Sequence, residues 1–253
     1  MKLAGRVAVI TGGAGAIGGA AARLLAREGA RIAIVDHEVE ACEAMAAALR
    51  AGGAEAMACA GDVADVATIE AQVAAVRAAW GGIDILVTAA GISCGGSVTT
   101  TAPADWAAVM RTNVDGTWLW CRAVLPLMQA AKRGAIVTVA SQLAVAGGHR
   151  NSAYIASKGA VMALTRTMAL DYVADGIRIN GVAPGATDTP MLRRAFERAP
   201  DPQAARDRSR LRHPMQRFAK AEEIAEGVLF LAADSASFVT GVVLPVDGGW
   251  LAA

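Results

Sequence analysis

The sequence feature that most constrains the fold is a glycine-rich turn near the N-terminus, set between a strand and a helix. Val7–Ile10 is a continuous apolar run, as expected for a strand buried on both faces. The turn follows at once, with the sequence Thr11-Gly-Gly-Ala-Gly-Ala-Ile-Gly18, and leads into an alanine-rich helix that Gly29 ends. A second apolar strand occupies residues 31–35, and Asp36 closes it. The order strand, glycine turn, helix, strand predicts two neighbouring parallel strands joined by a helix.

This turn has the composition of a dinucleotide site. Glycines let the backbone bend sharply and approach a pyrophosphate, whose charge the helix N-terminus stabilises. Asp36 lies 18 residues after Gly18, close to the distance at which an acid binds ribose hydroxyls. The competing interpretation is a tight turn with a purely structural role. The strand-helix-strand context and the acid favour the nucleotide site.

Strands and helices alternate along the rest of the chain. Further apolar strands are predicted at 55–60, 83–88, 135–140, 178–183 and 242–246, and helices at 39–50, 66–80, 103–131, 152–172 and 221–231. This alternation predicts an α/β fold, a doubly wound seven-stranded parallel sheet with helices on both faces. No repeat or linker divides the chain, so we expect a single domain over residues 1–253.

Polar and small residues stand where the predicted strands end. Ligands of such sheets bind outside the carboxyl ends of the strands. The residues at those ends include Gly12, Asp36, Asp62, Gly91 and Ser141. Because parallel strands all end at the same edge, a single site is expected to collect these residues.

A tyrosine and a lysine follow on the next predicted helix. Tyr154 and Lys158 stand four residues apart and therefore project from the same helix face. A neighbouring ammonium lowers the pKa of a tyrosine from its usual value of about 10. A tyrosine so tuned can exchange a proton with an alcohol or carbonyl oxygen. This spacing alone is common, and the nucleotide-binding pattern upstream is what favours catalysis.

Charge and cysteine content narrow the class of protein. The chain has 24 basic and 23 acidic residues, which indicates no partner such as nucleic acid or a charged membrane. Four cysteines without metal-like spacing indicate reduced thiols and no metal site. No uncharged run approaches the ~20 residues of a membrane span, and the N-terminal apolar run is too short for a signal peptide. We therefore expect a cytoplasmic protein.

Taken together, the motifs resemble those of the single-domain short-chain dehydrogenase/reductases over the whole chain. The matching residues are Thr11, Gly12, Ala16, Gly18, Asp62, Val63, Asn113, Ser141, Tyr154, Lys158, Pro184, Gly185, Thr187, Thr189 and Asp247–Gly249. One departure is clear. The family often has Asn-Asn-Ala-Gly where this chain has Thr88-Ala-Ala-Gly91, so no binding role is expected of the side chains of Thr88 and Ala89.

The resemblance implies a Rossmann fold and an oxidoreductase whose nicotinamide cofactor supplies the hydride. It implies that Tyr154 is the general acid/base and that Lys158 lowers its pKa and holds the nicotinamide ribose. Ser141 would hydrogen-bond the reacting oxygen, and Asn113 would position a water behind Lys158. The implied cofactor contacts are Gly12, Gly15, Ile17, Gly18, Asp36, Asp62, Val63, Ala90, Gly91, Tyr154, Lys158, Pro184, Gly185, Thr187 and Thr189.

The charge around the second strand favours NAD over NADP. An acid such as Asp36 pairs with a ribose diol and repels a 2′-phosphate. The only nearby basic side chain is His37, and the turn residues Gly13–Gly15 offer no Arg or Lys to a phosphate.

The expected substrate pocket is polar. Its border is predicted from Ser93, Cys94, Gln142, His149 and Asn151, which favours a small hydroxyl-bearing substrate such as a sugar, polyol or hydroxy acid. A lid is expected at about residues 188–214, where seven arginines lie between 191 and 212. These arginines form either a solvated helix face or, through Arg193 and Arg194, a contact for an anionic group.

Two alternatives and the assembly stay open. A 3-oxoacyl-thioester (acyl-carrier-protein) reductase is the main rival activity, and a non-catalytic NAD-binding regulator is the alternative outside enzymology. The resemblance implies a homotetramer assembled through the helices at 103–131 and 152–172 and the C-terminal strand. The cluster Trp118-Leu-Trp120 fits a subunit contact or core packing equally well.

Overall fold

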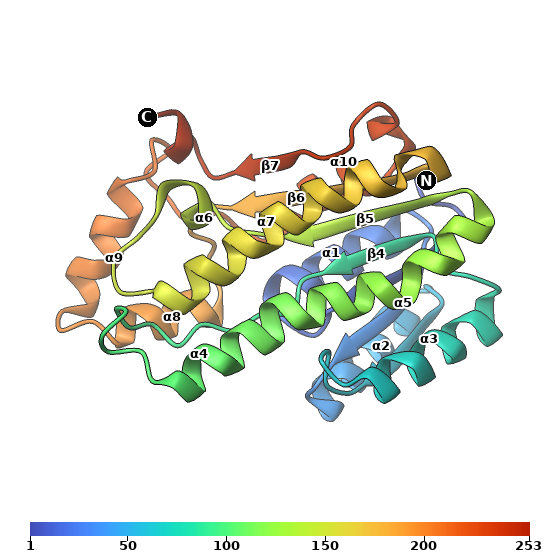
Figure 1. The fold of residues 1–253 in the computed structure, drawn as a ribbon, viewed down its shortest axis with the longest axis horizontal. Helices are drawn as coiled ribbons and strands as arrows, with labels where there is room; N and C mark the ends of the chain where they lie inside the picture. Colours follow the sequence, from blue (N-terminus) through green and yellow to red (C-terminus); the bar gives the residue numbers. More distant parts are fainter.

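Seven parallel strands form a single sheet in the order β3-β2-β1-β4-β5-β6-β7 (Figure 1). This is seen in a computed structural model that describes all 253 residues. The predicted α/β fold with a doubly wound sheet is confirmed. The strands are β1 (Val7–Thr11), β2 (Arg31–Asp36), β3 (Ala56–Ala60), β4 (Ile85–Thr88), β5 (Gly134–Val139), β6 (Ile177–Pro184) and β7 (Val243–Val246).

Helices cover both faces of the sheet because each strand is apolar on both sides. Along β2, Ile32 and Ile34 pack into one core, and Ala33 and Val35 pack into the other. The first core is closed by α1 (Ala16–Arg27), α2 (Val39–Ala51) and α10 (Ala221–Ala232). The second is closed by α3 (Val66–Trp80), α5 (Gly116–Ala131) and α7 (Ser152–Tyr172). None of the helices combines the length and apolar character that a membrane span requires.

The helix predicted over 103–131 is interrupted. It consists of α4 (Pro103–Met110), one π-helical turn (Arg111–Asp115) and α5. Within α5, Trp120 is buried in the core, whereas Trp118 is about half exposed at the surface. The cluster therefore divides between the core and the surface.

The lid segment folds into two short helices, α8 (Pro190–Glu197) and α9 (Pro202–Leu211). They lie at the end of the molecule to which the strand arrows of β5 and β6 point (Figure 1). A single helical turn, α6 (Leu143–Ala146), follows Ser141, and 3-10 turns occupy Val173–Asp175, Asp234–Ala236 and Trp250–Ala252. The lid is thus at the carboxyl ends of the strands, where the candidate residues lie.

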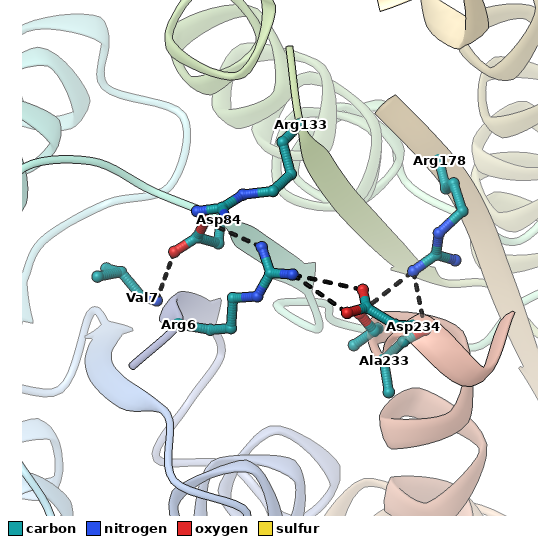
Figure 2. Close-up of polar contacts among 8 residues, drawn as sticks. Arg6, Val7, Asp84, Arg133, Arg178, Ala233 and Asp234 are labelled. Carbon is teal, nitrogen blue, oxygen red and sulfur yellow. Dashed lines mark hydrogen bonds and ion pairs between the residues drawn. The ribbon is translucent and has the colours of Figure 1, made fainter. Parts of the chain in front are cut away.

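A polar network links neighbouring strands at their amino ends, opposite the lid (Figure 2). Asp84, just before β4, accepts a hydrogen bond from the Val7 amide at 2.9 Å and pairs with Arg6 and Arg133. Arg6 also reaches Asp234 after α10. These contacts hold the beginnings of three strands in register at the end away from the lid.

Candidate active site

The glycine turn is shaped so that a ligand can approach the backbone. Gly12 has a φ of 62°, and a Cβ there would lie 2.7 Å from the backbone of Ala90. A Cβ on Gly18 would collide with the Gly12 carbonyl oxygen. Gly15 is the N-cap of α1 and Ile17 is half-buried in its first turn. Gly12 and Gly18 thus allow the turn to pack closely. Because the N-cap Gly15 is exposed and no side chain caps α1, the helix N-terminus is open to a pyrophosphate, so the residues fit a dinucleotide.

Asp36 lies directly beside this turn. Its Oδ2 atom accepts a hydrogen bond from the Ala14 amide at 3.1 Å, and Oδ1 accepts one from the His37 amide at 2.9 Å. The His37 ring lies between Asp36 and Glu38, 3.1 Å from each carboxylate. No Arg or Lys pairs with Asp36. The acid is thus placed where it can accept hydrogen bonds from a ribose diol.

Asp62 and Val63 follow β3 and extend the same edge. Burial pushes the pKa of Asp62 up, but hydrogen bonds from Ala64 and Arg111 hold it below its ordinary value. Arg111 Nη1 lies 2.6 Å from Asp62 Oδ2. Val63 packs against Gly116, where a Cβ would lie only 2.8 Å from Val63 Cγ2. The ionised Asp62 carboxylate and its neighbour therefore border the strand ends on the side of β3.

Ser141, Tyr154 and Lys158 are brought together by β5 and α7. Ser141 is buried two residues after the end of β5 and is close enough to Tyr154 to influence the pKa of its phenol. Lys158 is 4% exposed, and its Nζ atom lies 5.8 Å from the centre of the Tyr154 ring. The predicted spacing thus places both side chains on the face of α7 that packs against the end of β5.

The pKa expectation for the tyrosine is wrong in this structure. Burial raises the pKa of Tyr154 above its ordinary value, and Ser141 only partly opposes this. Burial also lowers the pKa of Lys158 to about 8, and its Nζ atom donates to the Val139 carbonyl at 2.6 Å. The ammonium donates to this carbonyl, and it contributes no lowering to the pKa of Tyr154.

Asn113 sits in the π-helical turn and is completely buried. Its side chain hydrogen-bonds both backbone groups of Ile92 and donates to Ser157 Oγ at 2.9 Å. A Cβ on Gly91 would lie 3.3 Å from Asn113 Oδ1 and 3.5 Å from Lys158 Nζ. Asn113 therefore anchors the segment after β4 beside Lys158. Ser157 was missed by the sequence reasoning, although it lies next to Lys158 in the chain.

The segment after β6 completes the row of strand ends. Pro184 ends β6, and Gly185 approaches Asp247 so closely that a Cβ would lie 2.7 Å from its Cα. Thr187 Oγ1 donates to the Gly185 carbonyl at 3.0 Å. Thr189 caps α8 by accepting a hydrogen bond from the Leu192 amide. Together with Ala90 and Gly91 after β4, these residues give a continuous edge from β3 to β6.

Some of the predicted substrate residues are buried or hydrogen-bonded near the strand ends, and others are exposed on loops and on the lid. Ser93 donates to Asn151 Oδ1 at 3.0 Å, and Gln142 is buried. His149 is exposed on the loop between α6 and α7. Arg193 is also exposed and pairs with Asp188 at 3.0 Å.

Arg194 is exposed, with no side-chain hydrogen bond. Arg198, the next arginine of the lid, donates to the Ser93 carbonyl at 3.2 Å. Arg198 is thus the lid arginine that reaches the predicted pocket border. Arg198 differs from Arg193 and Arg194 in this contact. The contact depends on how the lid lies over the pocket border, which only the tertiary structure shows.

A groove with apolar walls lies away from these residues. It has a volume of about 480 Å³ and runs between α3 and α5, lined by Val66, Arg77, Leu119 and Leu127 among others. It touches none of the catalytic candidates. We therefore place the site by its chemistry, at the carboxyl ends of the strands.

The chain is similar to known proteins along almost its whole length. Residues 12–251 match the family model described as enoyl-(acyl carrier protein) reductase. The chain is 42% identical to cis-4-hydroxycyclohexanecarboxylate dehydrogenase of Sinomonas cyclohexanicum, over 98% of this chain and 97% of that protein. It is 38% identical to D-threitol dehydrogenase of Mycolicibacterium smegmatis, over 98% of this chain and 94% of that protein.

A solved structure gives the same result for the fold. The crystal structure of levodione reductase superposes with a TM-score of 0.95 and 37% identity, over 99% of both chains. The chain therefore belongs to the short-chain dehydrogenase/reductase family, as an oxidoreductase that acts on CH–OH groups with a nicotinamide cofactor.

Proposed function

We propose that the protein is an NAD-dependent dehydrogenase that oxidises a secondary alcohol, or a sugar hemiacetal, on a small hydroxylated substrate. The observation that carries this proposal is that Ser141, after β5, and Tyr154 and the buried Lys158, both on α7, meet at the carboxyl end of β5. A bound cofactor would accept the hydride. The chain's own residues would then have to remove the hydroxyl proton and hold the oxygen in place.

In this proposal Tyr154 takes the proton of the substrate hydroxyl, and Ser141 steadies the oxygen through its own hydroxyl. Lys158 orients the nicotinamide ribose of the bound cofactor. Asn113 keeps Gly91 and Ile92 in place beside Lys158. Residues from the glycine turn to Thr189 hold the cofactor along the strand ends.

NAD is the proposed cofactor because of Asp36. Its carboxylate faces the glycine turn without a lysine or arginine partner, so a 2′-phosphate would meet an uncompensated negative charge. A ribose diol would instead donate hydrogen bonds to it.

The proposed substrate is a polyol, sugar or hydroxy acid. D-threitol is a polyol and cis-4-hydroxycyclohexanecarboxylate is a hydroxy acid, and the enzymes named for them are relatives of this chain. Polar Gln142, Ser93 and Asn151 support the same class. An anionic group on the substrate would be met by Arg198, or by Arg193 or Arg194 after the lid closes over it.

A substrate panel with purified protein tests this function. Sugars, sugar acids, polyols and 3-oxoacyl thioesters are each assayed with NAD(H) and with NADP(H), on the wild type and on Tyr154→Phe. We expect turnover of a hydroxylated substrate with NAD and a loss of at least ~100-fold in Tyr154→Phe with cofactor binding retained. Preference for the acyl thioester would favour the rival reductase. Cofactor binding without turnover on any substrate would favour the regulator.

We further propose that the enzyme works in the cytoplasm as a homotetramer. The exposed apolar side chains of α5, α7 and the loop before β7 support an assembly through these elements. They include Trp118, Leu170 and Phe238. A subunit contact would remove this apolar area from water.

A further inference from the structure

A buried serine joins α7 to the π-helical turn before α5. Ser157 is completely buried and stands directly before Lys158 in the chain. Its Oγ atom donates to the Tyr154 carbonyl at 2.7 Å and accepts from Asn113 Nδ2 at 2.9 Å. Asn113 belongs to the π-helical turn, so this hydroxyl connects that turn to the part of α7 that carries the tyrosine and the lysine.

These two contacts determine where the proton of the hydroxyl lies. A backbone carbonyl can only accept, so the single hydroxyl proton of Ser157 goes to Tyr154. The Oγ atom then has only lone pairs to offer to Asn113, which must present its NH₂ group. Ser157 therefore determines which end of the Asn113 amide faces α7.

The rest of the Asn113 amide is bound by Ile92. Nδ2 donates its other hydrogen to the Ile92 carbonyl at 3.0 Å, and Oδ1 accepts from the Ile92 amide at 2.8 Å. Turning the amide over would place Oδ1 against the Ile92 carbonyl and the Ser157 lone pairs, which would repel it. Asn113 is therefore held in one orientation, with Ser157 and Ile92 as its partners.

The segment that Asn113 holds borders the catalytic lysine. A Cβ on Gly91 would lie 3.3 Å from Asn113 Oδ1 and 3.5 Å from Lys158 Nζ. Because Lys158 is buried in close-packed surroundings, a shift of this segment would change the space and the polar atoms around its ammonium group. Through Asn113, the hydroxyl of Ser157 thus reaches the surroundings of Lys158.

We infer that Ser157 is a further positioning residue of the reaction, whose hydroxyl holds Asn113, and through it the segment after β4, in the arrangement that catalysis requires. The inference rests on the proposed function and adds a residue to its site. Ser157 itself is enclosed by protein and touches neither substrate nor cofactor. Its removal is therefore expected to lower kcat and to leave the affinity for the cofactor nearly unchanged.

A second buried hydroxyl on α7 provides a matched control. Thr165 is also completely buried, and it lies about 12 Å further along the helix than Ser157. Its Oγ1 atom donates to the Val161 carbonyl at 2.7 Å and pairs with Thr138 Oγ1 on β5 at 2.7 Å. Ser157→Ala and Thr165→Val each remove one hydroxyl and leave a buried polar neighbour with one partner fewer. Both should lower the free energy of unfolding by similar amounts.

Only the first of these variants should loosen the segment after β4. The measurement is hydrogen–deuterium exchange of the Ile92 amide, whose acceptor is Asn113 Oδ1. We expect this amide to exchange roughly 10-fold faster in Ser157→Ala than in Thr165→Val, which accounts for any general loss of stability. Equal exchange rates in the two variants would overturn the inference.

Steady-state kinetics test the link to the reaction. The value of kcat is measured with NAD and the panel substrate that wild type turns over fastest, and NADH binding is measured by fluorescence titration. We expect kcat to fall by about 10- to 100-fold in Ser157→Ala, with NADH affinity within about 3-fold of wild type. Thr165→Val should keep both values close to those of wild type.

A double-variant cycle tests whether Ser157 acts through Asn113. The cycle compares Ser157→Ala, Asn113→Ala and the combination of the two. If the hydroxyl acts by holding the amide, Ser157→Ala should lower kcat little further once the amide is gone. Additive losses would overturn the inference, since Ser157 would then act independently of Asn113.

The outcomes separate the inference from the proposed function. Faster exchange of the Ile92 amide in Ser157→Ala, without turnover of any panel substrate by wild type, would support the hold of Ser157 on Asn113 and overturn the dehydrogenase. A Ser157→Ala variant that keeps the kcat of an active wild type would overturn the inference alone.

Discussion

At the scale of single residues, the site depends on charges that the fold holds in places where charge is unfavourable. Lys158 is buried with a single hydrogen bond to the Val139 carbonyl, and burial lowers its pKa to about 8. Its ordinary value is 10.5. Holding the charged form at neutral pH therefore destabilises the folded protein, and the lysine is retained for chemistry rather than for stability.

The first prediction concerns this lysine. Between pH 8 and pH 10.5 the unfolded chain binds more protons at this position than the folded one, so the lysine's contribution to stability rises with pH there. Below pH 8 the full cost applies, about 3 kcal/mol. Lys158→Met should therefore be more stable than wild type at pH 7 by roughly 1–3 kcal/mol, and the gain should disappear near pH 10.5.

Urea unfolding without cofactor at pH 7, 8.5 and 10 checks this difference. Taking the difference between variant and wild type cancels the contribution of the buried thiols of Cys59 and Cys121. Burial raises their pKa values, to about 11 and 12, and they act in the opposite direction in alkaline solution. A variant less stable than wild type at pH 7 would contradict the prediction.

Asp36 carries the second residue-scale prediction. Asp36→Ala removes the acceptor for the ribose diol and the repulsion of a 2′-phosphate. We expect the KM for NAD to rise by about 10- to 100-fold. The difference between the KM values for NAD and NADP should become smaller. Glu38→Ala, which removes an exposed acid that does not contact the turn, is the control. Steady-state kinetics with both cofactors decide, and a wild type that prefers NADP would refute the assignment.

At the scale of elements, polar side chains just before the strands link the beginnings of neighbouring strands to one another. Asp84 links the Val7 amide, Arg6 and Arg133, and its side chain is only 15% exposed. Asp234 pairs with the same Arg6, but its side chain is 82% exposed. The two acids share a partner and differ in burial, so they form a matched pair.

The element-scale prediction follows from this difference. Asp84→Asn should lower the free energy of unfolding by about 1–3 kcal/mol, because a charged acceptor for several donors is lost in a poorly hydrated place. Asp234→Asn should change it by less than about 1 kcal/mol, as for other exposed ion pairs. If both variants lower the free energy of unfolding equally in thermal or urea unfolding, burial does not determine how much each acid contributes to stability.

At the scale of the whole molecule, the surface charge is nearly balanced, at +1, while several large apolar side chains are exposed. Such a surface gives no long-range steering and favours association of copies through apolar patches. Leu170 on α7 is 79% exposed, and Val39 at the start of α2 is 54% exposed. Only the first lies on an element proposed for the tetramer contact.

The whole-molecule prediction concerns this contact. Wild type should sediment with about four times the mass of the 25.7 kDa chain. Leu170→Glu should release smaller species because it buries a charge in the contact. Val39→Glu should leave the assembly intact. Analytical ultracentrifugation measures the mass of the wild type and of both variants. A monomeric wild type would contradict the proposed homotetramer.

The sequence alone determined the order of elements and the residues at the strand ends. Continuous apolar runs specify buried strands, and glycines such as Gly12 and Gly29 stand where φ is positive, so both signals are local. The spacing of Tyr154 and Lys158 likewise follows from the helix repeat. For this reason the sheet and its parallel strands are predicted correctly from the sequence.

Only the tertiary structure decided what those side chains touch. In the π-helical turn, the side chain of Asn113 bonds Ile92 and Ser157, which are far from it in the chain. The direction of Lys158 toward Val139, and the pairing of Gln142 with His213 across 71 positions, arise in the same way. Hydrogen bonds and burial between distant segments have no periodic signal in the sequence, so the pKa of Tyr154 and the contacts of His213 appear only once the chain is folded.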